Sequence, residues 1–272
     1  FYIFIYNIYI MEGQNSIYYI NSINRFAGTT NNFTYVVNIP DSSNYDSVAV
    51  MQANIPMSYY LVQSGYNTFN LREGGTTVTV TIPIGNYNAN SFITVVVPLL
   101  NAASPNHWTY TMTLPNTFTQ PSTGKYTFTV SGNTTQPSFI FTENVNELFG
   151  FPINTTATFV GNTLVSQNVL KFILEDSLVI HSDICESDGN ILQEVFGNNT
   201  QTFSNITFLN PDIECYSRKL NANKSNLYTF SLNDERGRGV DLNGLNMFFS
   251  IVLFKRNNFS QIFKEYIKYT IN

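Results

Sequence analysis

Side chains that could act as nucleophiles, general bases or metal ligands are few and far apart in this sequence. The two histidines, His107 and His181, do not lie beside a serine or cysteine nucleophile motif. No H-x-x-x-H or C-x-x-C spacing occurs, so the common zinc-binding patterns are missing. We therefore predict a protein that is not an enzyme and has no catalytic residue, metal site or cofactor. A hydrolase built on a β-sandwich is disfavoured for the same reason.

Cysteines and acidic residues give equally weak signals. Cys185 and Cys215 could meet in space, but nothing in their spacing demands a disulfide, and we expect free, buried thiols. Asp183, Glu186 and Asp188 stand before a Gly-Asn pair, in a pattern that partly resembles a calcium loop. The twelve-residue spacing with its terminal glutamate is missing, which favours an acidic turn.

The densest charge cluster is Asp234-Glu235-Arg236-Gly237-Arg238-Gly239, in a chain of which only 11% is charged. Its Gly-x-Gly lacks the third glycine and the helix of a phosphate-binding loop, so we predict a tight turn between two strands. Two interpretations stay open: a solvated turn, or a contact between subunits made by Asp234, Glu235, Arg236 and Arg238. Arginine favours interfaces because its planar fork pairs with carboxylates. On the second interpretation, Arg236→Glu with Arg238→Glu should weaken assembly and leave the fold intact.

Composition excludes further classes of protein. The net charge is −5 and no run of basic residues exists, which argues against specific nucleic-acid binding. No stretch reaches the roughly 18 to 20 apolar residues of a transmembrane helix. The first ten residues, FYIFIYNIYI, carry no charge and lack the basic region and cleavage site of a secretory signal. They are either translated upstream sequence that is not native, or an arm that becomes ordered on assembly.

Short β-like segments dominate the chain and recur every 10–15 residues, with Gly, Pro and Asn between them. This pattern is typical of an antiparallel β-sandwich. A helix is predicted after Asn88, because apolar residues follow that potential N-cap at three- and four-residue spacing up to Leu100. The predicted strands are 33–39, 47–54, 67–71, 76–82, 107–114, 125–130, 138–141, 168–174, 177–184, 203–209, 227–232 and 246–255.

Two groups of short motifs resemble one known family. The first group is Ala53-Asn54-Ile55-Pro56, Asn67-Thr68-Phe69, Gly85-Asn86-Tyr87 and Glu147-Leu148-Phe149-Gly150-Phe151; the second is Tyr228-Thr229-Phe230-Ser231-Leu232, Asp234-Glu235-Arg236-Gly237, Val240-Asp241-Leu242-Asn243-Gly244 and the strand before Phe254. Together they resemble the penton, or minor capsid, proteins of virophages and polinton-like viruses. The resemblance implies a jelly-roll protein that forms homopentamers at icosahedral capsid vertices, among double-jelly-roll major capsid proteins.

The resemblance also implies an organisation into parts. We expect an N-terminal arm over residues 1–32, a jelly-roll capsid domain over 33–64 and 161–272, and an outward-facing α+β domain inserted over 65–160. The fold class is thus an all-β jelly-roll sandwich with a small insertion. The expected location is the virion, after assembly in the host cytoplasm or a virus factory. The alternative is a receptor- or glycan-binding β-domain, in which exposed tyrosines and Trp108 would stack on sugars.

Overall fold

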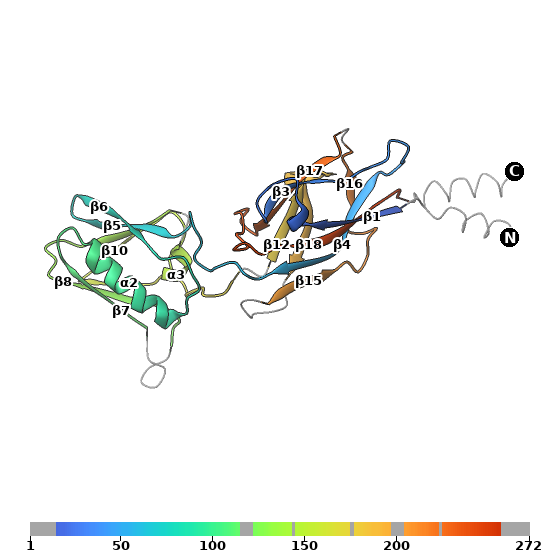
Figure 1. The fold of residues 1–272 in the computed structure, drawn as a ribbon. Helices are drawn as coiled ribbons and strands as arrows, with labels where there is room; N and C mark the ends of the chain where they lie inside the picture. Colours follow the sequence, from blue (N-terminus) through green and yellow to red (C-terminus); the bar gives the residue numbers. More distant parts are fainter. Residues whose placement is uncertain are drawn as a thin grey trace. The chain divides into compact units, whose positions relative to one another are not determined.

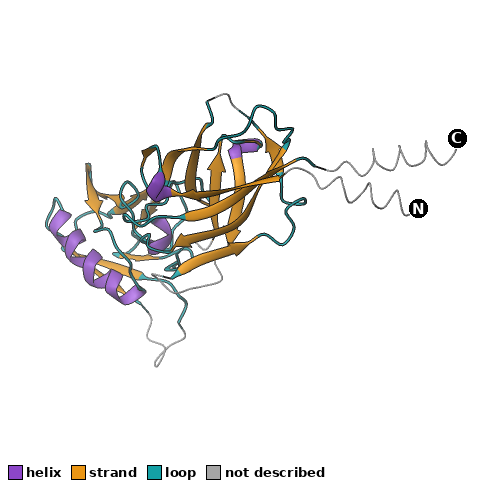
Figure 2. Cartoon of the chain, turned by 45° about the vertical axis from the view of Figure 1, so that its right-hand side comes forward, coloured by secondary structure: helices purple, strands orange, loops and turns teal. Residues whose placement is uncertain are grey.

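The computed structural model divides the chain into two compact units. It describes residues 15–114, 122–142, 145–174, 177–196, 204–222 and 225–256, so the first ten residues lie outside the described part. One unit combines Phe1–Tyr59 with Glu175–Asn272 and is called the jelly-roll unit below. The other, Tyr60–Leu174, is called the inserted unit. Strands are the main secondary structure of the described chain, and α2 (Ala89–Ala103) is its longest helix (Figure 2).

The jelly-roll unit contains two antiparallel sheets (Figure 1). Sheet A has the order β1-β18-β4-β16-β13, and β15 pairs with β4 beside β16. Its strands are β1 (Asn15–Asn21), β4 (Ser47–Pro56), β13 (Cys185–Glu186), β15 (Asn205–Leu209), β16 (Arg218–Leu220) and β18 (Phe248–Phe254). Sheet B has the order β14-β12-β17-β3-β2. Its strands are β2 (Ala27–Gly28), β3 (Asn32–Val36), β12 (Ser177–Ser182), β14 (Ile191–Phe196) and β17 (Leu227–Asp234). The 3₁₀ turn η1 (Ser22–Asn24) lies between β1 and β2, and η2 (Asp188–Asn190) lies between β13 and β14.

The strand order is that of a jelly roll. In chain order the long strands are β1, β3, β4, β12, β14, β15 with β16, β17 and β18. Numbered in this order, the strands of sheet A are the first, eighth, third and sixth (β1, β18, β4, and β15 with β16). The strands of sheet B are the fifth, fourth, seventh and second (β14, β12, β17 and β3). Apart from the paired strands β12 and β14, consecutive strands of this list lie in different sheets, as two interlocked Greek keys require. The predicted antiparallel jelly-roll sandwich with a small helix-containing insertion is confirmed.

Aromatic side chains join the two sheets in the core. Phe230 of β17 lies 5.3 Å from Phe249 of β18, measured between ring centroids, and 5.9 Å from Phe33 of β3. Phe230 and Phe249 are fully buried, and so is Leu232, which follows on the same face of β17. Alternation of such residues with polar ones directs one face of each sheet inward, and this alternation is the signal that predicts the strands.

The inserted unit has two small sheets, one long helix and one short helix. One sheet has the order β10-β9-β5-β6 and the other β11-β8-β7. The strands are β5 (Thr68–Glu73), β6 (Thr76–Thr81), β7 (Thr109–Thr113), β8 (Thr127–Ser131), β9 (Ser138–Phe141), β10 (Thr155–Thr158) and β11 (Thr163–Val165), and the short helix is α3 (Asn146–Phe149). Phe149 occupies the centre of the core, with ring centroids 4.6 Å from Phe69 and 5.2 Å from Phe92 and Phe141.

Helix α2 forms for the reasons that its sequence indicates. The side chain of Asn88 accepts hydrogen bonds from the backbone N–H groups of Asn90 and Ser91, which completes an N-cap. Phe92 and two further apolar residues at four-residue spacing are buried against the core. Pro98 is tolerated because it lies on the exposed side, where water can reach the carbonyl group that it leaves without a helix hydrogen bond.

A buried carboxylate ties β5 to the end of α2. Glu73 is 1% exposed. Its Oε1 accepts hydrogen bonds from Ser104 Oγ at 2.7 Å and from the Tyr110 hydroxyl at 2.8 Å, and its Oε2 accepts one from the Asn106 backbone N–H at 3.0 Å. Ser104 Oγ in turn accepts a hydrogen bond from the Trp108 backbone N–H. Burial, together with this bond to Glu73, raises the pKa of Tyr110 well above that of an ordinary tyrosine.

The boundaries of the parts differ from the expected ones. Residues 161–174, expected in the capsid domain, belong to the inserted unit, because β11 pairs with β8 and Leu170 and Phe172 pack on its core. Residues 168–174, predicted as a strand, form none. Residues 15–21, expected in an arm, form β1 and pair along the whole of β18. A free arm is therefore excluded for this segment, since β1 is an integral strand of sheet A.

Candidate assembly surfaces

The outward residues of four strands of sheet A, β1, β18, β4 and β15, are uncharged and about half apolar. The register places Ile17 beside Val252 and Ala49 in one row, and Tyr19 beside Ser250, Gln52 and Leu209 in the next. A third row contains Asn21, Phe248, Asn54 and Thr207. Residues directly opposite each other share a face of a sheet, so these eleven side chains lie on one side of sheet A. Ala49, Ser250 and Val252 are buried there, and Ile213 packs against the cluster that Ala49 and Val252 form. The eleven residues are called the uncharged face below.

This face exposes large side chains and carries no charge. Leu209 is 77% exposed, Tyr19 62% and Ile17 45%. The Tyr19 ring stacks on Phe248 with centroids 6.3 Å apart. None of the residues of β1, β18, β4 and β15 is charged. Interface cores are depleted of charge in the same way, and contiguous apolar patches mark interaction sites.

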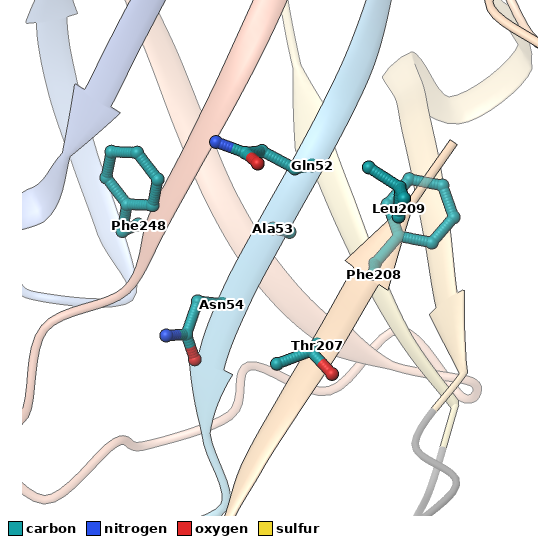
Figure 3. Close-up of a pocket in the computed structure, with 7 residues that line it drawn as sticks. All are labelled: Gln52, Ala53, Asn54, Thr207, Phe208, Leu209 and Phe248. Carbon is teal, nitrogen blue, oxygen red and sulfur yellow. The ribbon is translucent and has the colours of Figure 1, made fainter. Parts of the chain in front are cut away.

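A shallow groove of about 340 Å³ lies on this face (Figure 3). It is lined by Gln52, Ala53, Asn54, Thr207, Phe208, Leu209 and Phe248. In the close-up, the amides of Gln52 and Asn54 come from β4, while Thr207 and Leu209 come from the neighbouring β15. The lining offers uncharged hydrogen-bonding groups between apolar side chains. It therefore suits a neutral partner surface, and it has no carboxylate, imidazole or thiol for chemistry.

The outer face of sheet B differs in character. Thr34 of β3 pairs with Thr229 of β17, and Asn32 pairs with Ser231. Val36 continues the same face of β3 and is 44% exposed. This surface, formed by the outward residues of β3 and β17, is called the hydroxyl face below. Its side chains are mainly hydroxyls and amides, which can both donate and accept hydrogen bonds.

The 234–239 segment forms the tight turn that its sequence predicts. Asp234 is 3% exposed and accepts hydrogen bonds from the backbone N–H groups of Arg236 and Arg238, both at 2.9 Å. Arg238 Nε also donates to Asp234 Oδ2 at 2.6 Å, and Gly237 has a φ of +77°. Asp234 therefore organises the turn, and Arg238 is an internal ion-pair partner. Whether Glu235 and Arg236 touch a second subunit stays a prediction.

This geometry changes the mutational test of the turn. Reversing Arg238 would place a carboxylate against buried Asp234 and destabilise the fold itself. The double reversal of Arg236 and Arg238 therefore cannot separate an interface effect from a folding effect. Arg236→Glu alone makes the cleaner test, because it leaves the Arg238–Asp234 ion pair in place and keeps the backbone N–H that donates to Asp234.

The remaining chemical candidates are dispersed. His181 Nδ1 lies 2.8 Å from the Gly189 carbonyl oxygen, while His107 is in the inserted unit, in a turn before β7 rather than on the predicted strand. Asp183 accepts a hydrogen bond from the Thr229 backbone N–H. Glu186 pairs with Lys219 across neighbouring strands. No group of three His, Cys, Asp or Glu side chains among the described residues could hold a metal ion.

Both cysteines are free, but they differ in exposure. Cys185 is buried, as expected, and burial raises the pKa of its thiol above the ordinary value. Cys215 is exposed, against the expectation of a buried thiol. It lies outside any strand, and its backbone N–H donates a hydrogen bond to Asp212 Oδ1.

None of the helices that the structure describes combines the length and apolar composition needed for a membrane crossing.

The inserted unit does not present the aromatic side chains that sugar binding would use. Trp108 is 5% exposed and belongs to the core. Every other aromatic ring described in this unit is buried or only partly exposed. Stacking on a sugar ring needs an accessible aromatic face, so the described part of the inserted unit does not support sugar stacking on Trp108.

Sequence reasoning did not single out the uncharged face. The signal was present, because the segments that form β1, β4, β15 and β18 contain no Asp, Glu, Lys or Arg. Those segments are distant in the chain, however, and only the register shows that their outward residues form one surface. The charged turn, in contrast, can be recognised in the sequence because its residues are consecutive.

Comparisons with known proteins show a likeness to solved structures. No protein-family model matches the chain, and no curated protein matches it. Among solved structures, it is similar to the crystal structure of a selenomethionine-labelled mavirus penton protein. The two share 10% sequence identity with a TM-score of 0.44, over 89% of this chain and 100% of the other.

Proposed function

We propose that this chain is a structural protein of an icosahedral virion, a penton that forms homopentamers at the capsid vertices. The observation that carries the proposal is the combination of the jelly-roll strand order with the uncharged face, a partly apolar surface on β1, β18, β4 and β15 of sheet A. A jelly roll is a recurrent fold of viral capsid proteins. A free monomer gains nothing from exposing Tyr19 and Leu209 on the same face, whereas an assembling subunit buries them.

The motif resemblance supports the same function. The Ala53-Asn54-Ile55-Pro56 motif spans the end of β4, and the second group of motifs covers β17, the 234–239 turn and β18. The second group thus falls on the jelly-roll unit, whereas the other three motifs of the first group lie in the inserted unit. In the proposed virion, the neighbours of the pentamer are double-jelly-roll major capsid proteins, and the inserted unit faces outward. Assembly takes place in the host cytoplasm or a virus factory.

A ring of five copies requires a head-to-tail contact. Each copy then uses two different surfaces, one toward each neighbour, and the ring closes when the rotation between neighbours is one fifth of a turn. Low surface charge is compatible with this arrangement because the sides of the subunit are removed from water. No chemistry is required of the site, in agreement with the lining of the groove.

Electron microscopy of the purified full-length chain tests this proposal. Averages of negatively stained particles should show rings with five-fold symmetry. Averages that show single subunits, two-fold pairs or open filaments at concentrations up to about 100 µM would refute the penton function. That range covers the μM affinities at the weak end of interfaces of standard size.

A further inference from the structure

The uncharged face exposes large apolar side chains, and a protein that assembles can bury such side chains against a neighbouring subunit. We infer that this face of one copy packs head to tail against the hydroxyl face of a second copy of the chain. The inference rests on the proposed function, and it names the surfaces through which the ring closes. Tyr19 and Leu209 are the exposed anchors on one side, and Thr229 and Val36 lie on the other.

The chemistry of the uncharged face selects a neutral partner. A charged side chain buried against β1, β18, β4 and β15 would find no opposite charge there, which makes its desolvation costly. The amides of Gln52 and Asn54 still need hydrogen-bonding partners once water is removed. The hydroxyl face supplies neutral donors and acceptors, since Thr229 and Asn32 are exposed on it.

The size of the uncharged face is compatible with such a contact. Four strands about 4.8 Å apart and about seven residues long give a projected area of roughly 450 Å². A specific interface buries about 800 Å² per partner, so the adjoining loops must contribute. Ile23 and Leu245 are 62% and 51% exposed, and they flank the end of β1 and β18, where the Ser22 N–H donates to the Met247 carbonyl. These two residues add exposed apolar surface next to the ends of the two strands.

Symmetry decides which surface of the second copy is used. Two uncharged faces packed on each other would form an isologous pair, which closes at two copies and leaves no ring. A ring needs a second, different surface on each copy. The outer faces of two packed sheets point in opposite directions, so the hydroxyl face is turned toward the other neighbour. The sandwich architecture itself thus provides the two sides of a head-to-tail contact.

Single lysine substitutions at exposed positions test the inference without disturbing the core. In Leu209→Lys the new charge lies on the uncharged face, and in Thr229→Lys it lies on the hydroxyl face. Each should raise the concentration of half-assembly about 30-fold or more. The charge of Leu209→Lys has no partner on the uncharged face, and Thr229→Lys places a longer side chain and a charge, beside Asp183, in the contact. Val160→Lys is the matched control, since Val160 is 80% exposed but lies in the inserted unit. Sedimentation velocity measures assembly, and circular dichroism checks the fold.

Mixing the two variants distinguishes head-to-tail from face-to-face packing. Leu209→Lys copies retain a normal hydroxyl face, and Thr229→Lys copies retain a normal uncharged face. We expect each variant alone to be monomeric and an equimolar mixture to form pairs through the one intact contact. If Thr229→Lys copies pair on their own, the uncharged faces pack on each other and the inference is wrong.

The remaining outcomes separate this inference from the proposed function. If the wild type forms five-membered rings and Leu209→Lys forms them equally well, the penton function stands and the assigned surface is wrong. The same conclusion follows if Val160→Lys disrupts the ring as strongly as Leu209→Lys. If the wild type itself stays monomeric, the penton function and the inference both fail.

Discussion

Replacing Glu73 by alanine should destabilise the inserted unit strongly. The carboxylate is buried and accepts hydrogen bonds from Ser104, Asn106 and Tyr110, which belong to the end of α2, the following turn and β7. Alanine removes the acceptor and leaves all three donors in a poorly hydrated place. Because these donors come from consecutive elements, the loss affects the packing of the α2–β7 connection on the hairpin of β5 and β6.

The magnitude follows from opposing terms. A hydrogen bond to a charged group contributes about 1.5–3 kcal/mol, so three contribute roughly 6 kcal/mol. Burial of a carboxylate costs several kcal/mol, and its removal offsets about half of that loss. We expect Glu73→Ala to cost about 3 kcal/mol. Glu73→Gln keeps one oxygen acceptor but turns an amide N–H toward the Asn106 N–H, and it should cost about 1.5 kcal/mol.

The single tryptophan of the chain makes this prediction easy to measure. Trp108 lies in the core of the inserted unit, and its backbone N–H donates to Ser104 Oγ. Its fluorescence therefore follows the unfolding of this unit. At a slope of about 2 kcal/mol per molar urea, Glu73→Ala should lower the midpoint by about 1.5 M. Glu147→Ala is the matched control, because Glu147 is half-exposed and its pair with Lys171 is worth less than about 1 kcal/mol. A midpoint in Glu73→Ala no lower than in Glu147→Ala would refute the reasoning.

Three further predictions concern other parts of the chain. Asp234→Ala should lower the stability of the jelly-roll unit by about 3 kcal/mol, because it removes a buried acceptor and the partner of an ion pair; circular dichroism should show the loss while Trp108 fluorescence does not change. Gly150→Ala should destabilise the inserted unit by about 3 kcal/mol or prevent its folding, since Gly150 has a φ of +73° and an added Cβ would lie 2.6 Å from a backbone oxygen; a normal Trp108 midpoint would contradict this. Burial raises the pKa of Tyr126, so its contribution to the stability of the inserted unit is complete below pH 10, the ordinary tyrosine pKa, and is lost as the pH rises above it. Urea midpoints between pH 9 and pH 11 should therefore fall less steeply in Tyr126→Phe than in the wild type.

Local features of the structure could be predicted from the sequence, because the signals for them are local. The helix after Asn88 shows its cap and its apolar spacing within one segment, and the hairpin of β5 and β6 shows its Gly-Gly turn. The 234–239 turn is equally local, and Asp234 completes it with bonds to residues two and four positions away. Each element is stabilised by groups that are already neighbours in the chain.

Other features depend on contacts between distant segments. Residues 15–21 are assigned to an arm from the sequence, yet they pair with Phe248–Phe254, more than two hundred residues away. Glu73 precedes a glycine turn, which indicates an exposed residue, but its partners begin at Ser104. The uncharged face combines four strands from three parts of the chain. The spacing of residues within one segment contains no information about such contacts.

The native mass of the purified wild-type chain tests the central claim most directly. Mass photometry at nanomolar and light scattering at micromolar protein concentration cover the expected range of affinities for an interface of standard size. The penton function predicts one assembled species of five chain masses, in equilibrium with monomer and with few intermediates, because only ring closure satisfies both surfaces of every copy. A mass of one chain at every concentration, or a stable mass of two chains, would contradict it.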